Sequence, residues 1–154
     1  MSELADIIGS LQFRVAELER RLRSQNRTGN VEEADFVNGL VRVRLSTGML
    51  TGWIPWEEQA AGANRTHVPP SIGQQVTLHS ETGDLHDARV QTSLNSDANV
   101  RPSDRGDEYV LLSVGAASIT VSHGGASLVI TVGTSTLTMT AGAITAVSPR
   151  IDLN

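Results

Sequence analysis

A nine-residue repeat fills the last third of the chain and constrains its fold more than any other feature of the sequence. Glycine recurs at nine-residue intervals, and apolar and hydroxyl side chains alternate within each block. The repeat glycines are Gly115, Gly124, Gly133 and Gly142. A short fixed period of this kind is typical of stacked β-structure such as a solenoid or a β-helix. The repeat therefore predicts a rigid shaped element rather than a catalytic one.

Two apolar columns run through the blocks and form the expected core of this element. The predicted core residues are Ile119, Val121, Leu128, Ile130, Leu137 and Met139. Serine and threonine are expected on the outside. The pattern weakens in the fourth block, where Ala146 and Ser148 take the core columns. We interpret that block as the taper or cap of the stack.

The repeat lies in a segment that carries no Asp, Glu, Lys or Arg from Tyr109 to Pro149. In a single copy, its strands would leave open edges that invite aggregation, and they would bury too little surface to be stable alone. A single-chain solenoid of four turns without caps is equally unpromising. We therefore expect several chains to wind around one another. The alternative is that these strands complete a sandwich with the preceding domain.

Residues 1–26 are predicted to form an amphipathic helix with a heptad seam. The apolar seam residues alternate spacings of four and three: Leu4, Ile8, Leu11, Val15, Leu18 and Leu22. This period favours self-association, and the alternative is a helix packed on its own domain. β-Branched residues at position a with leucine at d lean toward a dimer, yet three heptads are too short to hold an oligomer together alone. The helix thus leaves the oligomeric state open.

Residues 27–98 are predicted to form a small β domain. Arg42 and Arg44 alternate with apolar residues, which indicates a strand with one wet face. The expected strands are residues 40–45, 50–56, 76–79 and 88–94. Short strands separated by Gly- and Pro-containing turns favour a small closed barrel. A polar linker is expected at 99–108, and the β-helix spike at 109–154.

The order of these parts resembles a known family, baseplate assembly protein V of contractile-tailed phages. This central tail spike is related to the spikes of contractile bacteriocins and type VI secretion systems. The residues that carry the resemblance are Trp53–Trp56, Val68–Val76, Gly83–Leu85 and Ser93–Ser96. The resemblance implies an OB-fold domain followed by an intertwined trimeric β-helix, and the trimer number comes from the family alone.

The resemblance also implies a function and partners. The chain would be a structural component of a contractile tail baseplate, a spike that caps the tail tube and pierces the host outer membrane. Its partners would be two further copies of itself in a homotrimer, baseplate hub and tail tube proteins, and the bacterial outer membrane as target. It would be assembled in the host cytoplasm and reside in the virion tail baseplate or a tail-like particle.

Spikes of this family often hold a metal ion at the apex through a His-x-His pair from each chain. No His-x-His occurs in this sequence, and the repeat segment holds a single histidine, His123. A histidine at a turn, facing outward or hydrogen-bonded, is the preferred interpretation of His123, so no metal or cofactor is expected. Two alternatives stay open: a spike without an apical metal, or a chain that lacks the natural tip.

No arrangement typical of an enzyme emerges from the sequence. Nucleophilic catalysis needs a base beside the nucleophile, and no serine lies in a nucleophile-elbow sequence. His79 and His86 lack an evident third zinc ligand. The carboxylates at 32–33, 57–58 and 104–108 are interpreted as solvated loop charges. We therefore expect no enzymatic activity, with a cell-envelope-degrading tail enzyme as one alternative.

A nucleic-acid-binding OB-fold module is the other alternative. Such modules stack bases on aromatic side chains above a basic groove. The chain carries a formal net charge of −5 and only two Trp, one Tyr and two Phe. This composition argues against a nucleic-acid partner.

Overall fold

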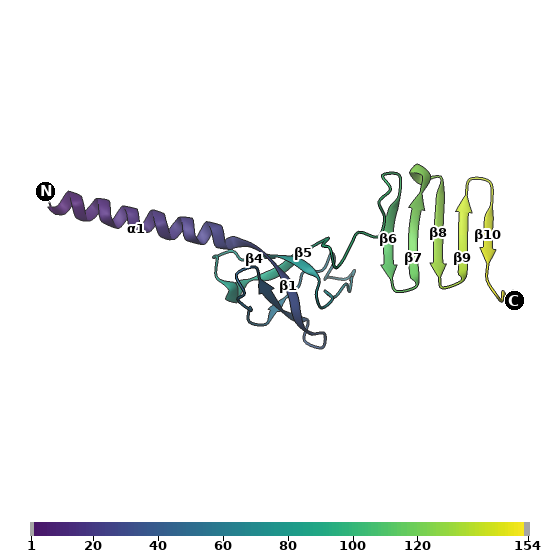
Figure 1. Cartoon of the computed structure of the whole chain (residues 1–154), viewed down its shortest axis with the longest axis horizontal. Coiled ribbons are helices and arrows are strands. Elements are labelled where there is room, and N and C mark those ends of the chain that lie inside the picture. Colours follow the sequence, from purple (N-terminus) through teal and green to yellow (C-terminus); the bar gives the residue numbers. More distant parts are fainter. Residues whose placement is uncertain (1, 153–154) are drawn as a thin grey trace. The chain divides into compact units, whose positions relative to one another are not determined.

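The computed structural model describes residues 2–152 and divides into two compact units, one within residues 1–100 and one within residues 101–154. The first contains a long helix and a curled five-stranded sheet, and the second contains another five-stranded sheet (Figure 1). The predicted class, a mainly β chain with an N-terminal helix and a small curled β domain, is confirmed. The finer division at residues 26, 98 and 108 stays a prediction.

The first unit forms one antiparallel sheet in the order β3-β2-β1-β4-β5. Its elements are α1 (Ser2–Gln25), β1 (Asn26–Asp35), β2 (Leu40–Leu45), β3 (Ile54–Pro55), β4 (Gln75–His79), the 3-10 helix η1 (Leu85–Asp87) and β5 (Arg89–Leu94). Trp56 forms an isolated bridge with Val90, and the Glu57 N–H donates to the Val90 carbonyl at 2.8 Å. These contacts join the two edges of the curled sheet.

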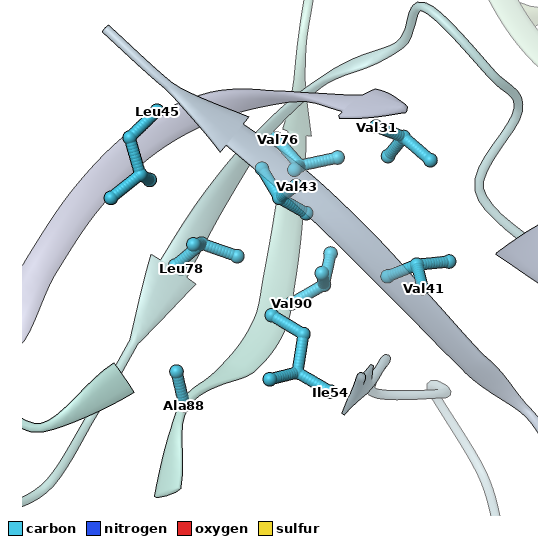
Figure 2. Close-up of a cluster of buried hydrophobic side chains, with 9 residues drawn as sticks. All are labelled: Val31, Val41, Val43, Leu45, Ile54, Val76, Leu78, Ala88 and Val90. Atoms are coloured by element: carbon cyan, nitrogen blue, oxygen red, sulfur yellow. The ribbon is translucent and has the colours of Figure 1, made fainter. Parts of the chain in front are cut away.

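The concave side of this sheet holds the core of the first unit. Figure 2 shows its buried side chains: Val31, Val41, Val43, Leu45, Ile54, Val76, Leu78, Ala88 and Val90. On β2 the inward valines alternate with Arg42 and Arg44, which form ion pairs with Glu33 and Glu32 of β1. The alternation predicted for residues 40–45 is thus confirmed.

The central strand β1 is absent from the expected strands. Its sequence is polar, and only Gly29 and Val31 are buried. The strand forms because it pairs with β2 on one side and β4 on the other. Long-range backbone pairing of this kind leaves no periodic apolar signal in the sequence.

The strand expected at residues 50–56 is wrong in extent, because β3 covers only Ile54 and Pro55. The Thr51 side chain replaces part of the missing strand pairing. Its hydroxyl accepts from the Val43 N–H at 3.0 Å and donates to the Gly52 carbonyl at 2.8 Å. Thr51 is buried, so a side chain satisfies a backbone donor that a strand would otherwise satisfy.

The C-terminal end of α1 is fixed to the loop that follows β4. The Gln25 carbonyl accepts from the Ser80 N–H at 2.8 Å, and the Gln25 side-chain amide donates to the Glu81 carbonyl at 3.1 Å. Gly83 faces the backbone of Arg21, where a Cβ on the glycine would lie 2.6 Å from the Arg21 carbonyl oxygen. The last turns of α1 are therefore held in a fixed position against the loop that follows β4.

The second unit is an antiparallel meander in the order β10-β9-β8-β7-β6. Its elements are β6 (Tyr109–Val114), β7 (Ala117–Ser122), the 3-10 turn η2 (His123–Gly125), β8 (Ser127–Val132), β9 (Ser135–Thr140) and β10 (Ile144–Val147). Figure 1 shows these strands side by side, each reversing the direction of the one before. Each nine-residue block therefore supplies one strand and one turn.

All the repeat glycines lie in the turns between these strands. Gly115, Gly124 and Gly133 have positive φ angles of 56°, 62° and 58°. Side chains with a Cβ rarely adopt this conformation. Gly142 does not share it, so three of the four glycines serve a backbone requirement that the fourth does not have.

Candidate assembly surfaces

The repeat sheet presents an apolar face that is built from two cross-strand rows. The first row is Ile119, Ile130, Leu137 and Ala146, and the second is Val121, Leu128, Met139 and Ile144. All six predicted core residues therefore lie on one face. Residues of the same sequence column do not lie side by side, because successive strands are antiparallel. Ile119 therefore lies opposite Ile130 rather than beside Leu128.

The odd length of the repeat explains why this face stays apolar. Side chains alternate between the two faces of a strand, and each turn reverses the strand direction. The positions on the apolar face are therefore odd-numbered in β7, even-numbered in β8 and odd-numbered again in β9. In β7 to β10 the opposite face carries mostly hydroxyl residues: Ser118, Thr120, Ser122, Ser127, Val129, Thr131, Thr136, Thr138, Thr140, Thr145 and Val147.

The apolar face of the repeat sheet is not buried within one chain. Within residues 101–152, Ser122 is the only buried residue, and the sheet has no buried hydrophobic side chain of its own. At the strand ends, Val132 is 61% and Ile144 is 73% exposed. Strands β6 and β10 form the two edges of the sheet, and each pairs on one side only. One copy thus leaves one face and both edges without a partner.

Strand β6, which precedes the first repeat glycine, also contributes to the apolar face. Leu112 lies opposite Ile119, and Tyr109 lies opposite Val121. A register shift between Val110 and Leu112 keeps both on this face. The predicted core did not include these residues, although the apolar run that precedes Gly115 is the signal that would have found them.

The seam of α1 is a second apolar surface that no other described residue covers. Its residues are 47–65% exposed: Leu4, Ile8, Leu11, Val15, Leu18 and Leu22. On the polar side, Glu17 accepts from Arg20 and Arg21 at 2.8 Å, and these bonds lower the pKa of Glu17 to about 2. No helix among residues 2–152 is long and apolar enough to cross a membrane.

Three of the carboxylates interpreted as solvated loop charges have structural roles, and two of them, Glu32 and Glu33, do not lie in a loop. Glu32 and Glu33 lie in β1 and form ion pairs with arginines of β2. Glu58 is half-buried and accepts from the Val68 N–H, the Trp56 indole N–H and the Thr66 hydroxyl. These bonds, led by that from Val68, lower the pKa of Glu58. Glu58 therefore fixes the loop after β3 and keeps its charge.

The histidines are not gathered at one place in the described chain. A ring nitrogen of His79 lies 3.0 Å from the Asn26 side-chain oxygen, and the His86 backbone N–H donates to Asp84. His123 is exposed in the turn after β7, with a φ of 54°. Residues 2–152 contain no group of three or more His, Cys, Asp or Glu that would suit a metal ion.

The curled first unit matches a known domain family. Residues 27–94 match the family described as the type VI secretion system/phage-baseplate injector OB domain, and the domain that they form belongs to it. The chain is also similar to the spike protein of Escherichia phage P2, with 39% identity over 93 residues. This match covers 60% of the chain and 44% of the P2 protein, so the chain spans less than half the length of that relative. The comparisons therefore identify the curled sheet of the first unit as an OB domain of this family.

Proposed function

We propose that three copies of this chain form a rigid spike at the end of a contractile tail. In this assembly the repeat sheets would wrap around one axis with their apolar faces inward and their edges paired between copies. The spike would cap the tail tube, dock on baseplate hub proteins and lead the tube through the host outer membrane.

The observation that carries the proposal is that the repeat sheet buries none of its hydrophobic side chains among the described residues and pairs β6 and β10 on one side only. An apolar face with two open edges and no formal charge from Tyr109 to Pro149 is an aggregation hazard for a single copy. Association removes both problems, because copies cover the apolar face and occupy the edges. The hydroxyl face would then coat the outside.

The similarity to the OB-domain family and to the P2 spike protein supports baseplate partners and a structural role. The printed name of the P2 relative describes a spike, and the OB domain is that of baseplate injectors. In the structure, Glu32 and Glu33 are engaged in ion pairs, and Glu58 is engaged in loop hydrogen bonds. We therefore propose a mechanical function, in which stiffness rather than chemistry opens the envelope.

The mass of the assembled protein tests the proposal directly. Sedimentation equilibrium of the full chain should give three times the mass of 16.4 kDa calculated for one chain. In detergent, the assembly should also keep this mass on heating until the repeat sheets of the three copies separate. A monomer at micromolar concentration would refute the proposed spike.

A further inference from the structure

The seam of α1 carries charges that fit a second copy of the same helix. The four-three spacing assigns Leu4, Leu11 and Leu18 to heptad position d, and Ile8, Val15 and Leu22 to position a. Arg14 then falls at position g and Glu19 at position e. In parallel helices in register, the g residue of one helix faces the e residue five positions later in its neighbour. Arg14 would thus face Glu19 of the next copy.

Arg14 is free to form an ion pair with another copy, as far as residues 2–152 show. No ion pair among the described residues includes it, whereas Glu19 pairs with Arg23 at 3.3 Å in an exposed contact. That contact leaves Glu19 more than half exposed and able to accept a second donor. Ile7 lies one heptad before Arg14 and also takes position g. Its side chain is 50% exposed and broadens the apolar seam.

We propose that α1 associates with the α1 helices of the other copies in a parallel, in-register coiled coil, with Arg14–Glu19 ion pairs between neighbouring helices. The inference rests on the proposed function, because a seam of three heptads is too short to associate alone. Sheets that hold the copies together would place the helices at millimolar effective concentration. The number of helices is then set by the assembly, even though the a and d residues by themselves lean toward two.

The fixed base of α1 supports this arrangement. Hydrogen bonds from Ser80 and to Glu81 hold Gln25, and the close approach of Gly83 to Arg21 fixes the last turns of the helix. Copies related by an axis through their OB domains would therefore send their helices out in the same direction. This geometry favours a parallel coiled coil over an antiparallel one.

Disulfide trapping tests the seam, since the natural chain contains no cysteine. Leu4→Cys places a thiol at the far end of the seam, whereas Asp6→Cys places one about 160° away around the same helical turn. Under mild oxidation the full-length Leu4→Cys protein should form covalent dimers at least tenfold faster than Asp6→Cys. In an antiparallel pair Leu4 would lie near Leu22, about 27 Å from its counterpart, and would not cross-link.

Charge reversal tests the register. On the Leu4→Cys background, Arg14→Glu should slow cross-linking by roughly 1.5- to 5-fold, the range that an exposed ion pair allows. Adding Glu19→Arg should restore the original rate, because the pair is re-formed with its signs exchanged.

The outcomes separate this inference from the proposed function. A trimeric mass with equal or negligible cross-linking at Leu4→Cys and Asp6→Cys would overturn the coiled coil and leave the spike intact. Failure of Glu19→Arg to restore the rate would overturn the parallel register. A monomeric mass of the unmodified chain would instead refute the spike.

Discussion

Gly29 of β1 lies so close to Arg44 of β2 that the position admits no side chain. A Cβ on Gly29 would lie 2.6 Å from the Arg44 carbonyl oxygen and 2.6 Å from Cγ1 of Val43. Gly29→Ala should therefore push β1 away from β2 and lower the free energy of unfolding of the OB domain by about 1–3 kcal/mol, as overpacking does. Chemical denaturation monitored by tryptophan fluorescence would measure it.

Gly52→Ala is the matched control for this change. Nothing lies within 4 Å of a Cβ at Gly52, and its φ is not positive. Its stability should change by less than about 0.5 kcal/mol, as for other surface substitutions. Equal stabilities of the two variants would contradict the close approach at Gly29.

Ile130→Asp should prevent assembly, and Thr131→Asp should not. Ile130 lies in the apolar row between Ile119 and Leu137, whereas Thr131 lies on the hydroxyl face opposite Thr136. A charge at Ile130 would be buried without a partner in every copy, at a cost of several kcal/mol each. Sedimentation should give monomers or aggregates for Ile130→Asp and the native mass for Thr131→Asp. The reverse result would mean that the hydroxyl face points inward.

Replacement of the repeat glycines should reveal two kinds of turn. Gly133→Ala forces an alanine into the left-handed region and should destabilise each chain by about 1 kcal/mol. Gly142→Ala meets neither a positive φ nor a neighbouring atom within 4 Å, so it should be close to neutral. The midpoint of thermal dissociation compares the two. A larger loss for Gly142→Ala would show that assembly, rather than the turn, requires that glycine.

The loop after β3 should loosen in acid. The hydrogen bonds to Glu58 lower its pKa in the folded state, so its contribution to stability is complete above the ordinary glutamate pKa of about 4.3 and is lost as the pH falls through the lower folded value. Amide hydrogen exchange at Val68, corrected for the intrinsic rate, should therefore accelerate below that range. Glu58→Gln should show faster exchange already at neutral pH and little further change in acid. Unchanged protection of Val68 in this variant would contradict the role of Glu58.

The two sheets differ in how much of their structure is predictable from sequence. The repeat sheet is local: each strand pairs with its sequence neighbours, so its period and alternation predict its apolar face. The OB domain is less predictable, because β1 pairs with β2 on one side and with the distant β4 on the other. Thr51 replaces strand pairing with a side-chain hydrogen bond, and Glu58 holds the loop after β3 through such bonds. Sequence periodicity carries no signal for either contact.

The sequence by itself determined the heptad seam, the positions of the repeat turns and the six apolar residues that share a face, since these follow from periods of 3.5, nine and two residues. Only the tertiary structure decided that successive repeats run antiparallel and that Ile119 therefore meets Ile130. It alone placed the polar strand β1 at the centre of the OB sheet. The physical reason is that strand direction and pairing depend on backbone contacts between segments, whereas periodicity records only which side of its own segment a residue occupies.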